Sequence, residues 1–509
     1  MAFRACGKMG SSLFRLLCLS ILFISVLAHA QVDTLRTVSR HMTLSNGKTL
    51  AYTVQMGRVP IRAGGSDEVL ANMFFVAYCV SSTEPRPITF LWNGGPGSPS
   101  STLHLESIGP KLIAANGKTV DFRDTALAST DLVFVDAVGT GFSRVTRSEF
   151  SDQFYQMRGD VSAFTDFVRA WRLLFGVEEY PIYLAGESWG AFRAAAVALR
   201  LEKQGIQVAG IIAISGRPAL PNARLDIVLR ALRTVQQALA AQYHGKSSTD
   251  LPKDPVALQQ LVHEWVMSTY VPALEHIDDL DHAQRDAIAN RLSEFTGIPE
   301  REINRSNLMI YPHQFLTELL HDQRKVLDTY DMRQTTDMSP RENIQVEERY
   351  LRHDLGYITD LAYIDVDHVL NGFSPDDGGI QGPNAMWDYK KGFFSTYVSG
   401  DQLEREDDEN LANGESPRGQ ETPDTAEAMA LDSHLRLLIA DGLYDSRSTC
   451  AISSEIVARQ GPSLQSRIIT RCYKGGHMFY LDPEVRRQFS EDLQQFTSDA
   501  TLPRLPLTR

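Results

Sequence analysis

The sequence predicts an α/β fold with a mostly parallel sheet, helices on both of its faces and a helical cap insertion. Short apolar, β-rich runs alternate with helical segments up to about residue 216, and the same alternation resumes after residue 430. A Gly-x-Ser-x-Gly run at 186–190 stands between an apolar run and an alanine-rich segment. This order predicts a strand, a sharp turn and a helix.

The first 30 residues are expected to be a signal peptide. Arg4, Lys8 and Arg15 precede an apolar run at 16–27, and Ala-His-Ala at 28–30 fits a cleavage site. The run is too short to span a bilayer comfortably, although an uncleaved membrane anchor is the alternative. We therefore expect an exported protein, secreted or periplasmic, with no stable membrane association.

The first part of the core, residues 31–216, is expected to contain five strands. They are placed at 70–80, 87–92, 131–136, 181–185 and 208–215. The first two are expected to be neighbours in the sheet. A helix precedes the fourth strand, because Phe164, Phe167, Trp171 and Leu174 recur at helical spacing, and these side chains are expected to pack in the core.

Residues 217–430 differ in pattern from the first part of the core: they are charged and mainly helical, with few strand-like runs, which predicts a cap or insertion. Within it, residues 400–426 are acidic and poor in apolar residues, as is typical of a mobile surface loop. The second part of the core, residues 431–509, is expected to contain strands at 435–440 and 467–473 and helices at 453–458 and 483–496. Such a cap would cover the carboxyl ends of the strands.

Ser188 is the candidate nucleophile, at the elbow of an α/β-hydrolase fold. Gly186 and Gly190 flank it because a turn that lifts a serine off the sheet leaves no room for Cβ atoms. A serine hydroxyl needs a base to take its proton and an acid to orient that base. In this fold the acid and then the histidine follow later strands.

Two acids and one histidine fit that order. Asp441 and Asp445 both follow the strand at 435–440, and periodicity alone does not choose between them. His477 follows the next strand, after Gly475 and Gly476, which let the imidazole reach over the serine. We expect His477 to be the general base.

The tetrahedral intermediate also needs backbone donors for its oxyanion. The amide of Trp189 is one candidate, and the glycine-rich turn at 92–97 (Trp-Asn-Gly-Gly-Pro-Gly) supplies the other. As a phosphate-binding loop this turn lacks the required lysine and glycine spacing.

Five motifs occur in the order known from one family of enzymes. They are WNGGPGS (92–98), DAVGTGFS (136–143), GESWG (186–190), GLYD (442–445) and GGHM (475–478). Together they resemble the serine carboxypeptidase family, peptidase family S10, particularly its bacterial branch. The resemblance implies a Ser-His-Asp triad, an oxyanion hole and a site for the substrate's C-terminal carboxylate. The implied residues are Ser188, Asp445 and His477 for the triad, Gly95 and Trp189 for the oxyanion hole, and Asn93, Gly94 and Glu187 for the carboxylate.

The resemblance thus favours Asp445 over Asp441 as the acid. A glutamate beside a bound carboxylate must be protonated to donate a hydrogen bond, because two close anions repel. Glu187 could instead simply brace the turn.

Three positions depart from the family pattern. Ser107 stands where eukaryotic members carry a second glutamate, with Glu106 one residue early; Ala137 replaces a usual proline, and Trp189 replaces the commoner tyrosine. The first departure puts the shared-proton arrangement of the two glutamates in doubt, and we therefore expect a less acidic pH optimum than is typical of the family.

Composition excludes some other functions. The formal net charge is −13, which argues against a nucleic-acid partner. Beyond residue 30 three cysteines remain, too few for a disulfide scaffold; Cys450 and Cys472 could pair or stay reduced. We expect no metal and no cofactor.

The sequence therefore predicts an exported carboxypeptidase that acts on peptides with a free C-terminus. Alternatives with the same fold are a proline iminopeptidase-like enzyme, an esterase or an acyltransferase. A catalytically inactive binding protein is the alternative from another class. Side-chain preference and oligomeric state are not indicated.

Overall fold

The structure is a computed structural model that describes residues 33–221, 227–335, 343–365, 386–388 and 424–498. The expected signal peptide lies outside the described residues, and so does most of the expected acidic loop at 400–426. The last three residues of that loop, 424–426, instead begin helix α16 (Asp424–Leu431), and all three are buried.

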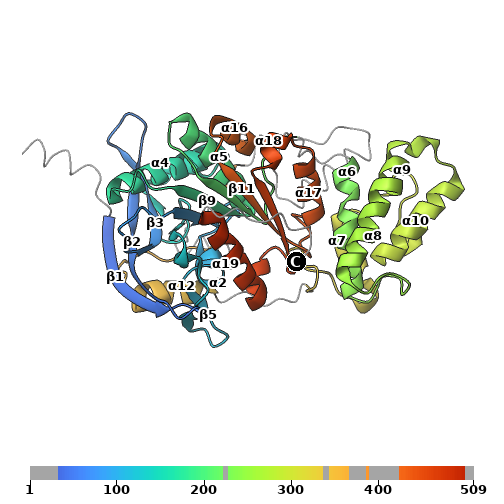
Figure 1. Ribbon diagram of the computed structural model, residues 1–509, viewed down its shortest axis with the longest axis horizontal. Coiled ribbons are helices and arrows are strands. Elements are labelled where there is room, and N and C mark those ends of the chain that lie inside the picture. Colours follow the sequence, from blue (N-terminus) through green and yellow to red (C-terminus); the bar gives the residue numbers. More distant parts are fainter. Residues whose placement is uncertain (1–32, 222–226, 336–342, 366–385, 389–423, 499–509) are drawn as a thin grey trace, which may run out of the picture.

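One large sheet forms the centre of the molecule (Figure 1). Its strands, in spatial order, are β1 (Asp33–Thr43), β2 (Thr49–Arg62), β3 (Val69–Val80), β7 (Asp131–Val135), β4 (Ile88–Trp92), β9 (Ile182–Glu187), β10 (Gly210–Ile214), β11 (Arg436–Gly442) and β12 (Ile468–Tyr473). From β7 to β12 all neighbours are parallel, whereas β1, β2 and β3 are antiparallel to their neighbours. This is the α/β-hydrolase fold predicted from the sequence.

All seven predicted strands are present within a few residues, but β1 and β2 were not foreseen. β2 carries the alternation of a strand with one buried face, since Leu50, Tyr52, Val54 and Met56 are buried. That period of two was the available signal. β1 pairs with β2 along most of its length and closes this edge of the sheet.

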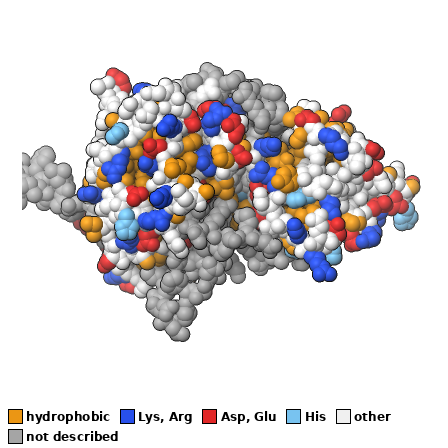
Figure 2. Space-filling view, turned by 90° about the horizontal axis from the view of Figure 1, so that it is seen from below, with side chains coloured by type: hydrophobic (Ala, Val, Ile, Leu, Met, Phe, Trp, Pro, Cys, Tyr) orange, Lys and Arg blue, Asp and Glu red, His pale blue; other side chains and the backbone are white. Residues whose placement is uncertain are grey.

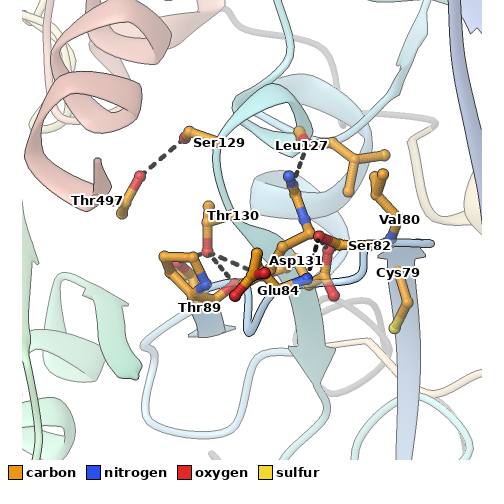
Figure 3. A network of polar contacts seen from close by, with 12 residues as sticks. Cys79, Val80, Ser82, Glu84, Thr89, Leu127, Ser129, Thr130, Asp131 and Thr497 are labelled. Atoms are coloured by element: carbon orange, nitrogen blue, oxygen red, sulfur yellow. Dashed lines mark hydrogen bonds and ion pairs between the residues drawn. The ribbon is translucent and has the colours of Figure 1, made fainter. Parts of the chain in front are cut away.

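The prediction that 70–80 and 87–92 are neighbours is wrong, because β7 lies between β3 and β4. A buried aspartate at the start of β7 helps to fix this order (Figure 3): Asp131 Oδ1 accepts hydrogen bonds from the Val80 amide and from Arg86 Nε, both at 3.0 Å. Thr89 of β4 and Thr130 share a hydrogen bond of 2.8 Å. These contacts join the ends of β3 and β4 to the middle strand.

Helices cover both faces of the sheet, as predicted. On one face lie α4 (Met157–Phe175), α5 (Trp189–Lys203), α16 and α17 (Cys450–Ala458); on the other lie α2 (Ser101–Glu106), α12 (Asn343–Arg349) and α19 (Pro483–Thr497). Phe164, Phe167 and Trp171 of α4 are buried against the sheet, and Leu174 is partly buried. Their predicted place in the core is confirmed.

The described residues of 217–430, the predicted cap or insertion, do not all lie together. The helices α6 (Ile227–Ala231), α7 (Arg233–Tyr243), α8 (Pro255–Trp265), α9 (Val271–Glu275) and α10 (His282–Thr296) form a lobe beside the core (Figure 1). Residues 343–364, by contrast, pack on the core, where Tyr357 contacts Phe74 and Phe142, with ring centroids 5.0 and 5.5 Å apart. The lobe and this segment therefore have different neighbours although both lie within 217–430.

Charges of both signs are interspersed over the core and the helical lobe on the face shown in Figure 2. Among the described residues, no helix is long and apolar enough to cross a membrane.

Candidate active site

Ser188 lies at a tight turn between β9 and α5. Its φ of 56° and ψ of −122° are rare for a residue with a side chain. A Cβ on Gly186 would overlap the carbonyl of Gly190, and one on Gly190 would lie 2.9 Å from the Trp92 carbonyl oxygen. Trp92 Nε1 donates to the Gly190 carbonyl at 2.9 Å, and the Ser188 amide donates to the Ile214 carbonyl at 2.8 Å. The turn is thus held from both sides, as the glycine spacing predicted.

His477 and Asp445 form a buried pair. His477 Nδ1 lies 2.7 Å from Asp445 Oδ2, and the two residues are 3% and 0% exposed. The other oxygen, Asp445 Oδ1, accepts a hydrogen bond from the Arg447 amide at 2.8 Å. Because Asp445 engages Nδ1, Nε2 is the nitrogen of His477 that can act on a hydroxyl group.

Asp441, the alternative acid, has other partners. It is buried, and Ser448 Oγ donates to its Oδ1 at 2.9 Å. Burial raises the pKa of Asp441 to about 6, against the hydrogen bonds from Ser453 and Ser448 that lower it. The geometry pairs Asp445, not Asp441, with the histidine.

The environment of His477 favours its charged form. Burial by itself lowers the pKa of His477, but the charge and hydrogen bond of Asp445, together with the charge of Glu187, raise it above 6.5. The ring packs against Tyr330, with centroids 5.3 Å apart. Nε2 is buried and has no hydrogen-bond partner in the described part of the chain. A general base with these properties is neutral only above its raised pKa.

The three residues lie at the same edge of the sheet, because each follows the carboxyl end of a parallel strand: β9, β11 or β12. The segment after β10 contacts all three strand ends. Ser215 donates from its amide to the Ala440 carbonyl at 2.8 Å and from Oγ to the His477 carbonyl at 2.5 Å. A Cβ on Gly216 would lie 2.6 Å from the Ser188 carbonyl oxygen. β10 therefore fixes the spacing of the site without supplying a predicted site residue.

The glycine-rich turn after β4 lies directly against the nucleophile turn. A Cβ on Gly94 would lie 2.6 Å from both the Trp189 amide nitrogen and the Glu187 carbonyl oxygen, so only glycine fits. Gly95 has a φ of 105° and is exposed, whereas Gly94 is buried. The two expected oxyanion donors thus come from adjoining turns.

Asn93 and Glu187 form a second buried pair at this edge. Asn93 Nδ2 donates to Glu187 Oε2, and Asn93 Oδ1 accepts from the Leu103 amide at 3.1 Å. The two residues are 6% and 4% exposed. The amide of Asn93 is therefore oriented by α2, and it in turn holds the carboxyl group of Glu187 beside Ser188.

Sequence reasoning missed an ion pair beneath this turn. Arg193 of α5 is fully buried, and its Nε and Nη2 donate to the two carboxylate oxygens of Asp160 at 2.6 and 3.1 Å. Arg193 Nη1 donates to the Asn93 carbonyl at 2.9 Å, and the guanidinium lies 4.3 Å from the Phe164 ring centroid. An arginine five positions after the serine, on the apolar face of α5, was the available signal.

Ser107 and Glu106, the two residues of the first departure from the family pattern, lie in different environments. Ser107 is fully buried, whereas Glu106 is half-buried and its charge acts on Arg486 of α19. Glu106 is thus tied electrostatically to the closing helix.

A disulfide joins the two later parts of the site. Cys450 and Cys472 are bonded, with Cα atoms 5.7 Å apart. Cys450, at the start of α17, follows Asp445 by five residues, and Cys472, in β12 (Ile468–Tyr473), precedes His477 by five, so the bond joins the elements next to the two loops that carry the pair. Among the described residues no cluster of histidine, cysteine and acidic side chains could hold a metal ion.

Residues 64–211 match the family model of serine carboxypeptidases, peptidase family S10. This range contains Asn93, Gly95 and Ser188 but ends before Asp445 and His477. Serine-type carboxypeptidase F of Aspergillus niger is 28% identical over 178 residues, which cover 32% of each chain. The chain thus aligns with about a third of the length of this curated relative. Both matches support the serine carboxypeptidase family.

Solved structures also resemble the chain. The prohormone-processing carboxypeptidase Kex1Δp of Saccharomyces cerevisiae is 14% identical, with 87% of this chain and 91% of that chain covered and a TM-score of 0.44. Homoserine O-acetyltransferase of Bacillus anthracis is 12% identical, with 93% and 99% covered and a TM-score of 0.33. Both TM-scores are below 0.5, so the fold is assigned from the strand order described above and not from these similarities.

Proposed function

We propose that this chain is an exported serine carboxypeptidase that removes C-terminal residues from peptides through an acyl-enzyme. The observation that carries this proposal is the buried Asn93–Glu187 pair beside Ser188. A carboxyl group that can be protonated and a side-chain amide are suited to binding a carboxylate. An esterase whose substrate carries no charged end would not need them at this position. The family match over residues 64–211 supports the same assignment. Its bacterial branch remains a prediction from the motifs.

In the proposed reaction, Ser188 Oγ attacks the carbonyl carbon of the last peptide bond while His477 Nε2 takes the hydroxyl proton. Asp445 holds the other ring nitrogen and stabilises the imidazolium that forms. His477 then protonates the leaving amino acid, and a water molecule hydrolyses the ester with His477 again acting as the base. The amides of Gly95 and Trp189 stabilise the oxyanion in both steps.

The substrate's terminal carboxylate is held by Asn93, the Gly94 amide and Glu187. Glu187 donates a hydrogen bond to it only when protonated, since two adjacent carboxylates repel. The Asn93 amide is pre-oriented by its bond to the Leu103 backbone, which reduces the cost of binding. Recognition of the chain end and attack on the adjacent bond thus involve residues of two adjoining turns, the one after β4 and the one after β9.

Three versions of one peptide test this assignment: free at both ends, acetylated at the N-terminus, and amidated at the C-terminus. We expect the first two to lose their last residue and the amidated peptide to resist. Cleavage that survives amidation but stops on acetylation would instead indicate an enzyme that acts on the N-terminal end. Ser188→Ala is the matched control, and full activity in that variant would exclude the mechanism.

The proposed export rests on the N-terminal sequence pattern. N-terminal sequencing of the protein recovered from its producing cell is expected to begin at Gln31. An intact Met1 in the recovered protein would contradict cleavage.

A further inference from the structure

Helix α7 of the lobe packs against the region that carries Asp445. It contacts α17, and the Tyr243 ring lies 5.8 Å from the ring of Tyr444, the residue before Asp445. His244 Nε2 lies 2.8 Å from the Met332 carbonyl, and the Met332 amide donates to the Tyr444 carbonyl at 2.9 Å. The lobe is therefore in contact with the loop of the catalytic acid.

Gln236, in the first turns of α7, is 1% exposed, and neither Oε1 nor Nε2 has a hydrogen-bond partner in the described part of the chain. Its neighbour Gln237 is different, because Gln237 Nε2 donates to the Ile310 carbonyl at 3.1 Å. A buried amide with no partner is costly, and native proteins commonly satisfy such groups with an ordered water molecule.

A small cavity lies beside Gln236, with a volume of about 20 Å³. Its lining includes the polar residues Gln236, Arg233, Asp445 and Thr449 and the apolar residues Phe315 and Leu316. A space of about 10–15 Å³ with two to four polar partners is sufficient for one water molecule. The volume of this cavity meets the first condition, and its polar lining residues are the candidates for the second.

Asp445 can accept a further hydrogen bond. A carboxylate has about four acceptor positions, and the bonds from His477 Nδ1 and the Arg447 amide occupy one position on each oxygen. Asp441 is a charged neighbour of this carboxylate, and Arg233 of α7 lines the same cavity. A water molecule in the cavity can accept from the Gln236 amide and donate to Asp445.

We propose that one ordered water molecule connects Gln236 to the Asp445 carboxylate, so that Gln236 of the lobe is a positioning residue for the catalytic acid. The inference rests on the proposed function of Asp445. By donating to the carboxylate, the water spreads its charge and fixes its orientation toward His477. The lobe thereby takes part in setting the basicity of the histidine, although it supplies none of the triad.

Gln236→Met tests this inference, because methionine is unbranched like glutamine but cannot make these bonds. Gln242→Met is the matched control on the same helix: Gln242 Nε2 donates to the Pro252 carbonyl at 2.6 Å, and Gln242 does not line the cavity. The rate at which a fluorophosphonate labels Ser188 and displaces fluoride is measured against pH, which reports His477 without assuming any substrate. Loss of the donated bond leaves the carboxylate more basic, so the acidic limb of the profile should move up by about half a pH unit in Gln236→Met. It should not move in Gln242→Met.

A crystal structure of the intact protein provides the second measurement. We expect a water molecule within hydrogen-bond distance of Gln236 and Asp445, and its loss in Gln236→Met. A cavity without water, a water that does not touch Asp445, or a Gln236→Met limb that coincides with the wild type would overturn the inference. Wild-type protein that is not labelled at all would instead refute the proposed function, while the crystallographic result would still report on the water.

Discussion

The buried Arg193–Asp160 pair allows a prediction whose size follows from its contacts. Arg193 is fully buried and Asp160 is 4% exposed, and two hydrogen bonds join them. Burial raises the pKa of Asp160, and Arg193 counteracts this effect. Replacing Arg193 by methionine would leave a buried carboxyl group without its cation and the Asn93 carbonyl without its donor.

Breaking a buried ion pair from one side typically costs about 3–5 kcal/mol. Part of this cost is the isolated charge, which a second substitution removes. In Arg193→Met/Asp160→Leu only the unpaired Asn93 carbonyl and imperfect packing remain, for a cost of about 1–3 kcal/mol. Methionine keeps apolar contact with Phe164, over which the guanidinium now lies. The double variant should therefore be about 2 kcal/mol more stable than Arg193→Met alone.

The assay is urea unfolding at neutral pH, followed by tryptophan fluorescence, for the wild type, both single variants and the double variant. A loss below about 1 kcal/mol in Arg193→Met, well under the typical cost of breaking a buried pair, would refute the reasoning. Equal losses in the single and double variants would show that the isolated charge is not the cause. Because Arg193 also holds Asn93, we expect both Arg193 variants to show a raised KM for peptides with a free C-terminus.

Three further predictions concern titratable groups. Asp445→Asn should lower kcat by about 10⁴-fold, because an amide cannot hold the imidazole in the required tautomer. Asp441→Asn should lower kcat far less, because Asp441 accepts from Ser448 and does not contact the histidine. Equal losses of kcat in the two variants would contradict the pairing of Asp445 with His477. The acidic limb of kcat/KM should lie above pH 6.5. Burial lowers the pKa of His477, but the charge and hydrogen bond of Asp445 and the charge of Glu187 together raise it by more, and only the neutral ring accepts a proton. A profile that peaks near pH 4–5 would count against this. Burial raises the pKa of Asp136 from 3.8 to about 7, so the wild type should lose stability as pH rises through this range. Urea unfolding should then show Asp136→Asn gaining about 2 kcal/mol on the wild type between pH 5 and pH 8, and a constant difference would disprove the shift.

Much of the site could be predicted because its parts are local. A serine between two glycines, a histidine after two glycines and an aspartate after a strand each reflect the chemistry of one turn. The order of these turns along the chain follows the fold, and the family resemblance favoured Asp445 over Asp441, so Ser188, Asp445 and His477 could be named together. The positions of seven strands were likewise predicted from apolar runs of the length of a strand.

What the sequence alone determined, then, was the α/β class and the positions of the turns that carry the proposed catalytic residues. Only the tertiary structure decided that β7 separates β3 from β4 and that Cys450 bonds Cys472. The family resemblance had favoured Asp445 over Asp441, and the structure places Asp445 against the histidine. It also revealed that Arg193 and the lobe residue Gln236 lie beneath and beside the reacting groups. The physical reason is the distance along the sequence over which each feature is set. Periodicity and turn chemistry act over a few residues, whereas strand order, buried ion pairs and shared cavities depend on contacts between distant segments, whose spacing no local pattern encodes.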